Sequence, residues 1–314
     1  MGILCESYTQ NNETFGLNMK RIFTVVLALA LGIFQTSVAP AQNKGSTRSA
    51  PVIVEKEYML FEDLASAINY LIDKKDPKII GFGEAHEEYF HLSPSPRPLS
   101  ARFQEILPLL RRGEDHLIVE RSPDPRLICN GHVPPEERLN IIFRTPRWDL
   151  NRWMATLHVA QGAGYFPHLL DYDCGDRRHL LRLEPDSYLK GPTLITAHAK
   201  NKVLEIEGAR KSAGITMYYG GAIHNDMFPY SGWEHWSFGS AFTKSSGGRY
   251  LEIDLYVPEI MEKMVEQRDQ LWLLSNDDRW YEIYQREGEK APVFLFQRSE
   301  NSYILVLERT AHNE

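Results

Sequence analysis

Hydrophobic and polar positions follow two different periods along the chain after residue 52. Apolar residues three or four positions apart, such as Leu64, Ile68 and Leu71, indicate amphipathic helices, whereas short runs rich in Val, Ile and Tyr indicate strands. Helices are expected over 61–72, over 101–112, after Pro146 within 141–160, and through Val203, Leu204 and Ile206. Strands are expected at 78–82, 117–120, 168–173 and 215–219. Because strands alternate with helices, the order predicts βαβ units around a parallel sheet.

The last third of the chain departs from this alternation. Short β-type runs occupy 250–255, 293–296 and 303–307, and a polar turn at 298–302 separates the last two. A tight turn between two strands favours antiparallel pairing. We therefore predict an α/β fold with a mostly parallel central sheet flanked by helices and an antiparallel C-terminal edge, all within a single domain at 53–314.

The N-terminal segment has the composition of an export signal. Lys20 and Arg21 precede an apolar run at 22–34, and Ala39-Pro40-Ala41 has the small-residue form of a signal-peptidase site. We expect translation to start at Met19, cleavage after Ala41, a flexible linker at 42–52, and a secreted or periplasmic mature protein. The alternative is a single membrane anchor, although the run is short for a bilayer span. No other segment has the length and apolarity of a transmembrane helix.

Charge and cysteine content narrow the functional classes. The net charge is −7, and no block of Lys or Arg occurs, which argues against nucleic acid as a partner. The partner that we expect is a small-molecule or peptide substrate. Two cysteines follow the signal, Cys129 and Cys174. An exported protein permits a disulfide between them, and two reduced thiols are the alternative. The oligomeric state has no signal in the sequence.

Candidate chemistry lies in the spacing Gly-x-x-His, which occurs four times and ends at His86, His116, His224 and His235. Only His86 and His224 directly follow expected strands. His116 precedes one, and His235 lies in a loop rich in Gly, Ser and Trp. Ligands of open α/β sheets bind beyond the carboxyl ends of the strands. We therefore predict that His86 and His224 belong to one site.

Other polar residues follow the same expected strands. They are Glu84 after the first strand, Glu120 and Arg121 after the second, Asp171 and Asp173 after the third, and Asn225 and Asp226 after the fourth. Two imidazoles and a carboxylate suit a divalent metal with open positions, so we predict His86, Glu120 and His224 as ligands. Glu84 would serve as general base or additional ligand. Polar residues that cap helix N-termini are the alternative explanation.

The motifs carry a family resemblance. Gly83-Glu84-Ala85-His86, the run 117–120 and the run 219–224 resemble the motif series of the superfamily that joins Tiki/TraB proteases, erythromycin esterases and ChaN-like haem-binding proteins, over about 78–229. The resemblance implies an active site at His86, Glu120 and His224. One departure is Lys200-Asn201, where the superfamily often has Arg before Asp or Asn. Lysine keeps the charge without the planar fork of arginine, and Lys200 is our candidate partner for developing negative charge.

Two functions follow from this resemblance. Tiki-type members imply an exported hydrolase of the peptidase or esterase type that depends on a divalent metal ion such as Mn, Co or Zn. ChaN-like members imply an envelope protein that binds haem or a metal without turnover. A scaffold that has lost activity is a third possibility, against which the intact Glu84, His86 and His224 argue.

Overall fold

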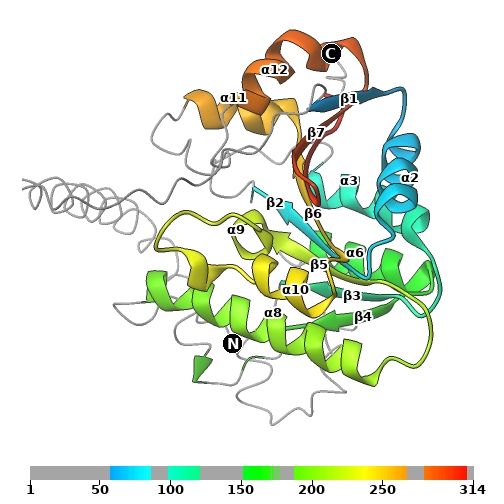
Figure 1. The fold of residues 1–314 in the computed structure, drawn as a ribbon, viewed down its shortest axis with the longest axis vertical. Helices are drawn as coiled ribbons and strands as arrows, with labels where there is room; N and C mark the ends of the chain where they lie inside the picture. Colours follow the sequence, from blue (N-terminus) through cyan, green and yellow to red (C-terminus); the bar gives the residue numbers. More distant parts are fainter. Residues whose placement is uncertain are drawn as a thin grey trace, which may run out of the picture. The chain divides into compact units, whose positions relative to one another are not determined.

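An eight-stranded sheet organises the part of the chain that the computed structural model describes, namely residues 57–85, 98–120, 151–170, 172, 175–176, 187–266 and 279–309 (Figure 1). The strands are β1 Tyr58–Phe61, β2 Ile79–Glu84, β3 His116–Val119, β4 Phe166–Leu169, β5 Thr216–Gly221, β6 Tyr250–Tyr256, β7 Val293–Ser299 and β8 Ser302–Val306. Their order in the sheet is β1-β7-β8-β6-β2-β5-β3-β4. Strands β4, β3, β5, β2, β6 and β8 pair in parallel, as the sequence predicts for βαβ units.

Helices cover both faces of this sheet. The larger core lies on one face and includes apolar side chains from α2 Leu64–Lys75, α3 Leu99–Ile106, α6 Asn151–Gly162, α11 Pro258–Glu266 and α12 Arg279–Glu287. The smaller core lies on the other face, under α8 Ser187–Ala209 and α10 Gly239–Ser245. A single helical turn, α9 Ala222–Asn225, follows β5 directly. Short 3-10 turns complete the described elements: η2 Leu107–Leu110, η4 Glu234–Trp236 and η6 Gly288–Lys290. The predicted α/β class is confirmed.

The C-terminal strands form the antiparallel part of the sheet. β7 pairs antiparallel with both β8 and β1, so the predicted antiparallel edge is confirmed. The run that begins at Tyr250 is not part of it, because β6 lies in the interior of the sheet and pairs in parallel with β2 and β8. The outermost strand on this side is β1, which the sequence pattern did not predict.

Element boundaries shift where local chemistry competes with apolar spacing. α2 begins after Asp63, whose carboxylate accepts the Ser66 amide at 2.7 Å, and Phe61, where the helix was predicted to begin, belongs to β1. The third strand was predicted too late, since β4 ends at Leu169. Between α3 and β3 the helix changes to the 3-10 turn η2, which carries Pro108 in its first turn.

Several predictions fall outside the described residues. They concern the signal segment 1–41, the linker 42–52, the two cysteines Cys129 and Cys174, and the strand-end residues His86, Arg121, Asp171 and Asp173. Residues 54–314 form one compact unit. Among the described helices, none is both long and apolar enough to cross a bilayer.

Candidate functional site

The carboxyl ends of β3 and β5 bring Glu120 and His224 together. β3 and β5 are neighbours, with Val119 opposite Tyr219, and the Glu120 amide extends the ladder by donating to the Tyr219 carbonyl at 3.0 Å. His224 lies on α9, immediately after β5. Its Nε2 is 4.0 Å from Glu120 Oε1, and its ring is almost fully buried. An imidazole and a carboxylate distant in sequence thus face each other at this end of the sheet.

The Glu120 carboxylate is held through Oε2, the oxygen that does not face His224. Its Oε2 accepts the Tyr218 hydroxyl at 3.1 Å and the Gly221 amide at 2.5 Å. Burial, followed by the charge of Glu120, raises the pKa of Tyr218 well above its usual value, so this hydroxyl stays a donor. A Cβ on Gly220 would come within 2.3 Å of Oε2, which explains why the position needs glycine. These contacts leave Oε1 directed toward His224.

The His224 ring has its tautomer set by its neighbours. Nδ1 lies 3.0 Å from the Trp236 carbonyl oxygen and 2.9 Å from Thr196 Oγ1. A carbonyl can only accept a hydrogen bond, so Nδ1 carries the proton that points at it. In the neutral ring Nε2 then keeps its lone pair, on the side of Glu120. Metal-ligating histidines commonly have their second nitrogen tied to a carbonyl in this way.

Glu84 lies at the same end of the sheet, but its hydrogen-bond donor comes from the other face. It is buried at the end of β2, and the Tyr219 hydroxyl donates to its Oε2. Tyr218 and Tyr219 are consecutive in β5, so their side chains point to opposite faces. The tyrosine that binds Glu84 therefore comes from the larger core, and the one that binds Glu120 comes from the face of α8.

Helix α8 reaches this site through Thr196. The Thr196 hydroxyl is buried and contacts both His224 Nδ1 and the Trp236 carbonyl, the latter at 2.5 Å. Lys200, one turn further along the helix, is exposed. His198, on the same helix, pairs with Asp176 at 2.8 Å. Thr196 was missed because a threonine within an apolar helical stretch carries no sequence signal of a polar contact.

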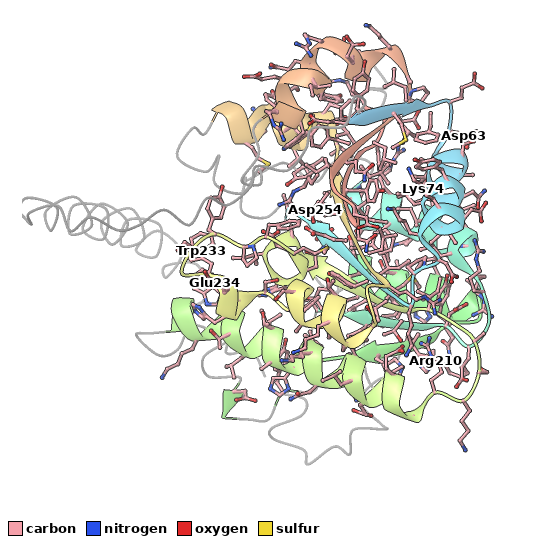
Figure 2. The ribbon with its side chains drawn as sticks, viewed as in Figure 1. Asp63, Lys74, Arg210, Trp233, Glu234 and Asp254 are labelled. Carbon is pink, nitrogen blue, oxygen red and sulfur yellow. The ribbon has the colours of Figure 1, made fainter. Side chains whose placement is uncertain are left out.

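The other two described histidines with the Gly-x-x-His spacing, His116 and His235, differ from His224 in their surroundings. His116 is the first residue of β3, whereas Glu120 follows the last residue of that strand. The Nδ1 atom of His116 lies 2.8 Å from His168 Nε2. Burial and the charge of neighbouring Arg210 lower the pKa of His116, and burial lowers that of His168 to about 4. His235 is exposed on η4. Its neighbours Trp233 and Glu234 lie on the loop after α9, to the left in Figure 2.

A second polar cluster, which we call the Arg298 cluster, consists of Arg298, Glu252, Asp254 and Asp226. The Arg298 guanidinium donates to Glu252 at 2.9 Å, to Asp254 at 3.2 Å and to Asp226 at 3.3 Å. Burial raises the pKa of Asp254 to about 7 and that of Glu252 well above its usual value, although Arg298 opposes both shifts. Sequence analysis missed this cluster, although two acidic residues on one face of the apolar run at 250–255 were a usable signal. Figure 2 labels Asp254 beside the ribbon of β2.

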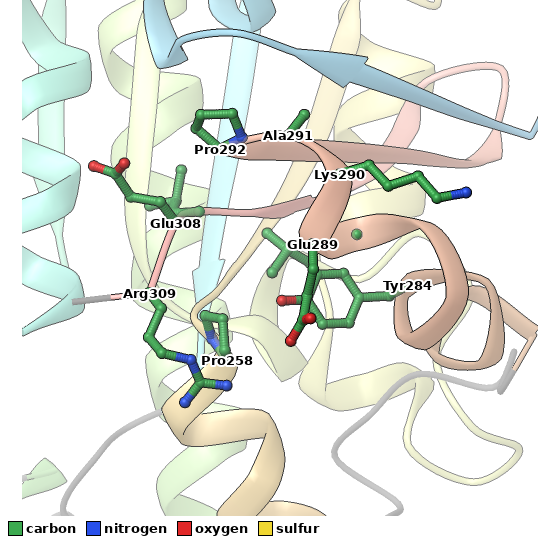
Figure 3. A pocket seen from close by; sticks show the side chains of 11 residues that line it. Pro258, Tyr284, Glu289, Lys290, Ala291, Pro292, Glu308 and Arg309 are labelled. Carbon is green, nitrogen blue, oxygen red and sulfur yellow. The ribbon is translucent and has the colours of Figure 1, made fainter. Parts of the chain in front are cut away.

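The pocket in Figure 3 lies elsewhere, at the carboxyl end of β8. Its volume is about 400 Å³, and it is lined mainly by the segment 288–292 and by residues 306–309. Two charged side chains on its wall already have partners, since Arg309 binds Glu262 and Lys290 binds Glu287. None of the site residues predicted from the sequence lines it.

Metal-binding potential depends on a residue outside the described part. Within the described ranges, no three His, Cys, Asp or Glu side chains form a group that could hold a metal ion. Of the three predicted ligands, only Glu120 and His224 fall within those ranges, and His86 follows the last described residue of the β2 end, Ala85.

No protein-family model, curated protein or solved structure matches this chain. The resemblance to the Tiki, erythromycin esterase and ChaN-like superfamily therefore rests on the three motifs alone.

Proposed function

We propose that this chain is an exported hydrolase of the peptidase or esterase type that uses a divalent metal ion bound by His86, Glu120 and His224. The observation that carries the proposal is the pair formed by His224 Nε2 and Glu120 Oε1, 4.0 Å apart at the carboxyl end of the sheet. β2, which His86 follows by two residues, is the strand beside β5. The three strands that precede these residues in the sequence, β2, β3 and β5, are thus adjacent in the sheet.

The described residues fit such an ion in donor type. Metal bonds to imidazole nitrogen and carboxylate oxygen are about 2.0–2.2 Å long, so two ligands of one ion lie at most about 4 Å apart. The 4.0 Å separation is compatible with that limit. Imidazole together with carboxylate suits Mn, Co or Zn. When bound, such an ion would lower the pKa of a coordinated water and polarise a carbonyl group.

The protein's own residues prepare the site in two ways. Tyr218 and Gly221 hold the Glu120 carboxylate, and Trp236 and Thr196 fix the His224 tautomer. The site lies at strand ends with little exposed surface, where electrostatic interactions are stronger than in water. In this proposal Glu84 accepts a proton, and Lys200 stabilises negative charge by reaching back along α8.

Elemental analysis and an absorption spectrum of the purified full chain test the proposal. We expect bound Mn, Co or Zn, a higher melting temperature with added metal, and a lower one with a chelator. His86→Ala and His224→Ala should each abolish this response. His235→Ala is the matched control, because His235 has the same Gly-x-x-His spacing but is exposed.

Two outcomes would contradict the hydrolase. A Soret band would indicate the haem-binding alternative. A metal response that survives both His86→Ala and His224→Ala would show that the ion binds elsewhere. His116→Ala is the weaker control, since His116 bonds to His168 and the pair is itself a potential ligand set.

A further inference from the structure

We propose that Asn225 is a positioning residue of the candidate site, and that its side chain fixes the carboxyl end of α9 so that the adjacent His224 faces Glu120. The inference rests on the proposed function for its catalytic meaning. Its geometric content, the orientation of the His224 ring, is independent of that function.

The position of α9 follows from a row of four residues across the sheet. Gly83 of β2 lies opposite Gly220 on one side and opposite Asp254 on the other. Glu120 continues the row beyond Gly220, where a Cβ would meet the Glu120 side chain. Residues in parallel register share a face, so the two carboxylates flank two glycines on one face. A Cβ on Gly83 would come within 2.3 Å of Asp254 Oδ1 and 2.7 Å of the Ala222 Cα, so α9 lies directly against β2.

A helix of this length cannot hold its own orientation. α9 has four residues, and a single turn fixes several dihedral angles for very few internal hydrogen bonds. Its beginning is fastened by the Gly221 amide to Glu120. Its end is fastened by Asn225, whose Nδ2 donates to the Gly81 carbonyl at 3.2 Å and to Asp254 Oδ1 at 3.3 Å. The Asn225 carbonyl also accepts the Tyr250 hydroxyl at 2.7 Å.

Asp254, which accepts the hydrogen bond from Asn225, is itself held in place by the other members of the Arg298 cluster. Arg298 binds Asp254 through the oxygen that Asn225 does not use. It reaches Asp254 across β8 from a point between Gln297 and Ser299, where the β7–β8 register shifts. A bulge of this kind redirects a side chain. The segment after α9 is tied to the same cluster, since Glu252 accepts the Met227 amide at 3.0 Å.

The alternative is that Asn225 only stabilises the core. One observation argues against it: Asn225 is fully buried, and its Oδ1 has no hydrogen-bond partner in the described part of the chain. A buried acceptor without a partner lowers stability. Orientation of α9 is a function that an apolar residue of the same size could not perform. Asn225 was grouped with the strand-end residues in the sequence, but no pattern there indicated a contact with Asp254.

The test compares the full chain carrying Asn225→Leu with a matched control, Tyr165→Phe. Both remove buried hydrogen bonds, because the Tyr165 hydroxyl donates to the Leu107 carbonyl at 2.5 Å, but only the first touches α9. Nitrogen NMR of 15N-labelled histidine, without metal, reports the His224 tautomer. We expect the Nδ1–H form in the native protein and in Tyr165→Phe, and mixed tautomers in Asn225→Leu.

Affinity for Mn²⁺, Co²⁺ or Zn²⁺ is the second readout. Loss of a residue that orients a ligand should weaken binding by roughly 10–100-fold. Asn225→Gln, which keeps an amide, should restore part of the affinity, and it replaces Asn225→Leu if that variant fails to fold. An unchanged His224 tautomer in Asn225→Leu would overturn the proposal. If the native protein binds no metal, the proposed function fails, and the tautomer comparison still decides the role of Asn225.

Discussion

The Glu120–His224 pair and the Arg298 cluster lie on the same face of one sheet, on either side of α9, and differ in how their charges meet. In the Arg298 cluster every contact of the guanidinium is direct, at 2.9–3.3 Å. In the pair the facing atoms are 4.0 Å apart, and each partner takes its short hydrogen bonds from other residues. Direct contacts balance the charges inside the cluster, whereas a separation of 4.0 Å is one that two ligands of a single ion can adopt. We infer that the cluster is structural and that the pair is the chemical site.

The largest expected effect is the loss of Arg298. Arg298→Ala leaves Glu252 and Asp254 buried without their counter-charge, and breaking a buried ion pair from one side costs about 3–5 kcal/mol. Urea unfolding monitored by circular dichroism measures this loss. Arg249→Ala, which breaks an exposed pair with Asp76, should cost only about 0–1 kcal/mol. Equal losses in the two variants would contradict a structural role for the cluster.

The second largest effect is expected when a methyl group is added at Gly83, in the row of residues that lies beneath α9. Gly83→Ala places a methyl group 2.7 Å from the Ala222 backbone, which cannot move aside without shifting α9. Overpacking of this kind costs about 1–3 kcal/mol. Gly162→Ala is the control, because a Cβ there meets nothing within 4 Å. Thermal unfolding of both variants tests this, and an equally stable Gly83→Ala would mean that α9 does not rest on β2.

A smaller effect is expected where only the orientation of Glu120 changes. Tyr218→Phe removes one hydroxyl donor and leaves the aromatic packing against Phe238. The expected loss of stability is about 0.5–1.5 kcal/mol, typical of one hydrogen bond. Metal affinity should fall more than stability does, since Oε1 is no longer directed at His224. A metal titration followed by calorimetry checks this, and unchanged affinity would remove Tyr218 from the site.

The last prediction concerns how the free energy of unfolding changes with pH. Burial raises the pKa of Asp254 to about 7, so between about pH 4 and 7 the folded protein holds a proton that the unfolded chain has released. The contribution of Asp254 to stability is therefore present at low pH and is lost as the pH rises toward 7. Asp254→Asn should flatten the fall in unfolding free energy across this window. An identical pH profile would show that Asp254 does not titrate there.

The sequence predicted much of the parallel sheet, because buried strands such as β2 and β5 are apolar runs bounded by glycine or charge. It did not predict β1, Tyr58–Phe61, whose partner β7 lies far along the chain. The runs 78–84 and 217–221 were also expected to end at the same edge of the sheet. β2 and β5 pair in parallel, with Glu84 opposite Gly221, so their ends do lie at one edge. The pairing partner of a short strand is a tertiary property that local pattern does not contain.

The candidate site was predictable only in part. Glu120 and His224 follow their strands, and strand ends are recognisable from sequence. The groups that orient them are not, because the Trp236 carbonyl is backbone and Tyr218 reads as an ordinary strand residue. Arg298 was assigned to a polar turn, yet it lies within β7. Its side chain is directed by a register shift that no periodicity reveals.

The pairing of β1 with β7 has a consequence for the timing of folding. Met59 lies opposite Leu295, so 236 positions of chain separate the two partners (295 minus 59). At the usual rates of ribosomal synthesis, β7 leaves the ribosome on the order of ten to fifty seconds after β1. Until then the first strand of the domain has no neighbour to pair with. This edge of the sheet can therefore close only after β7 has been synthesised.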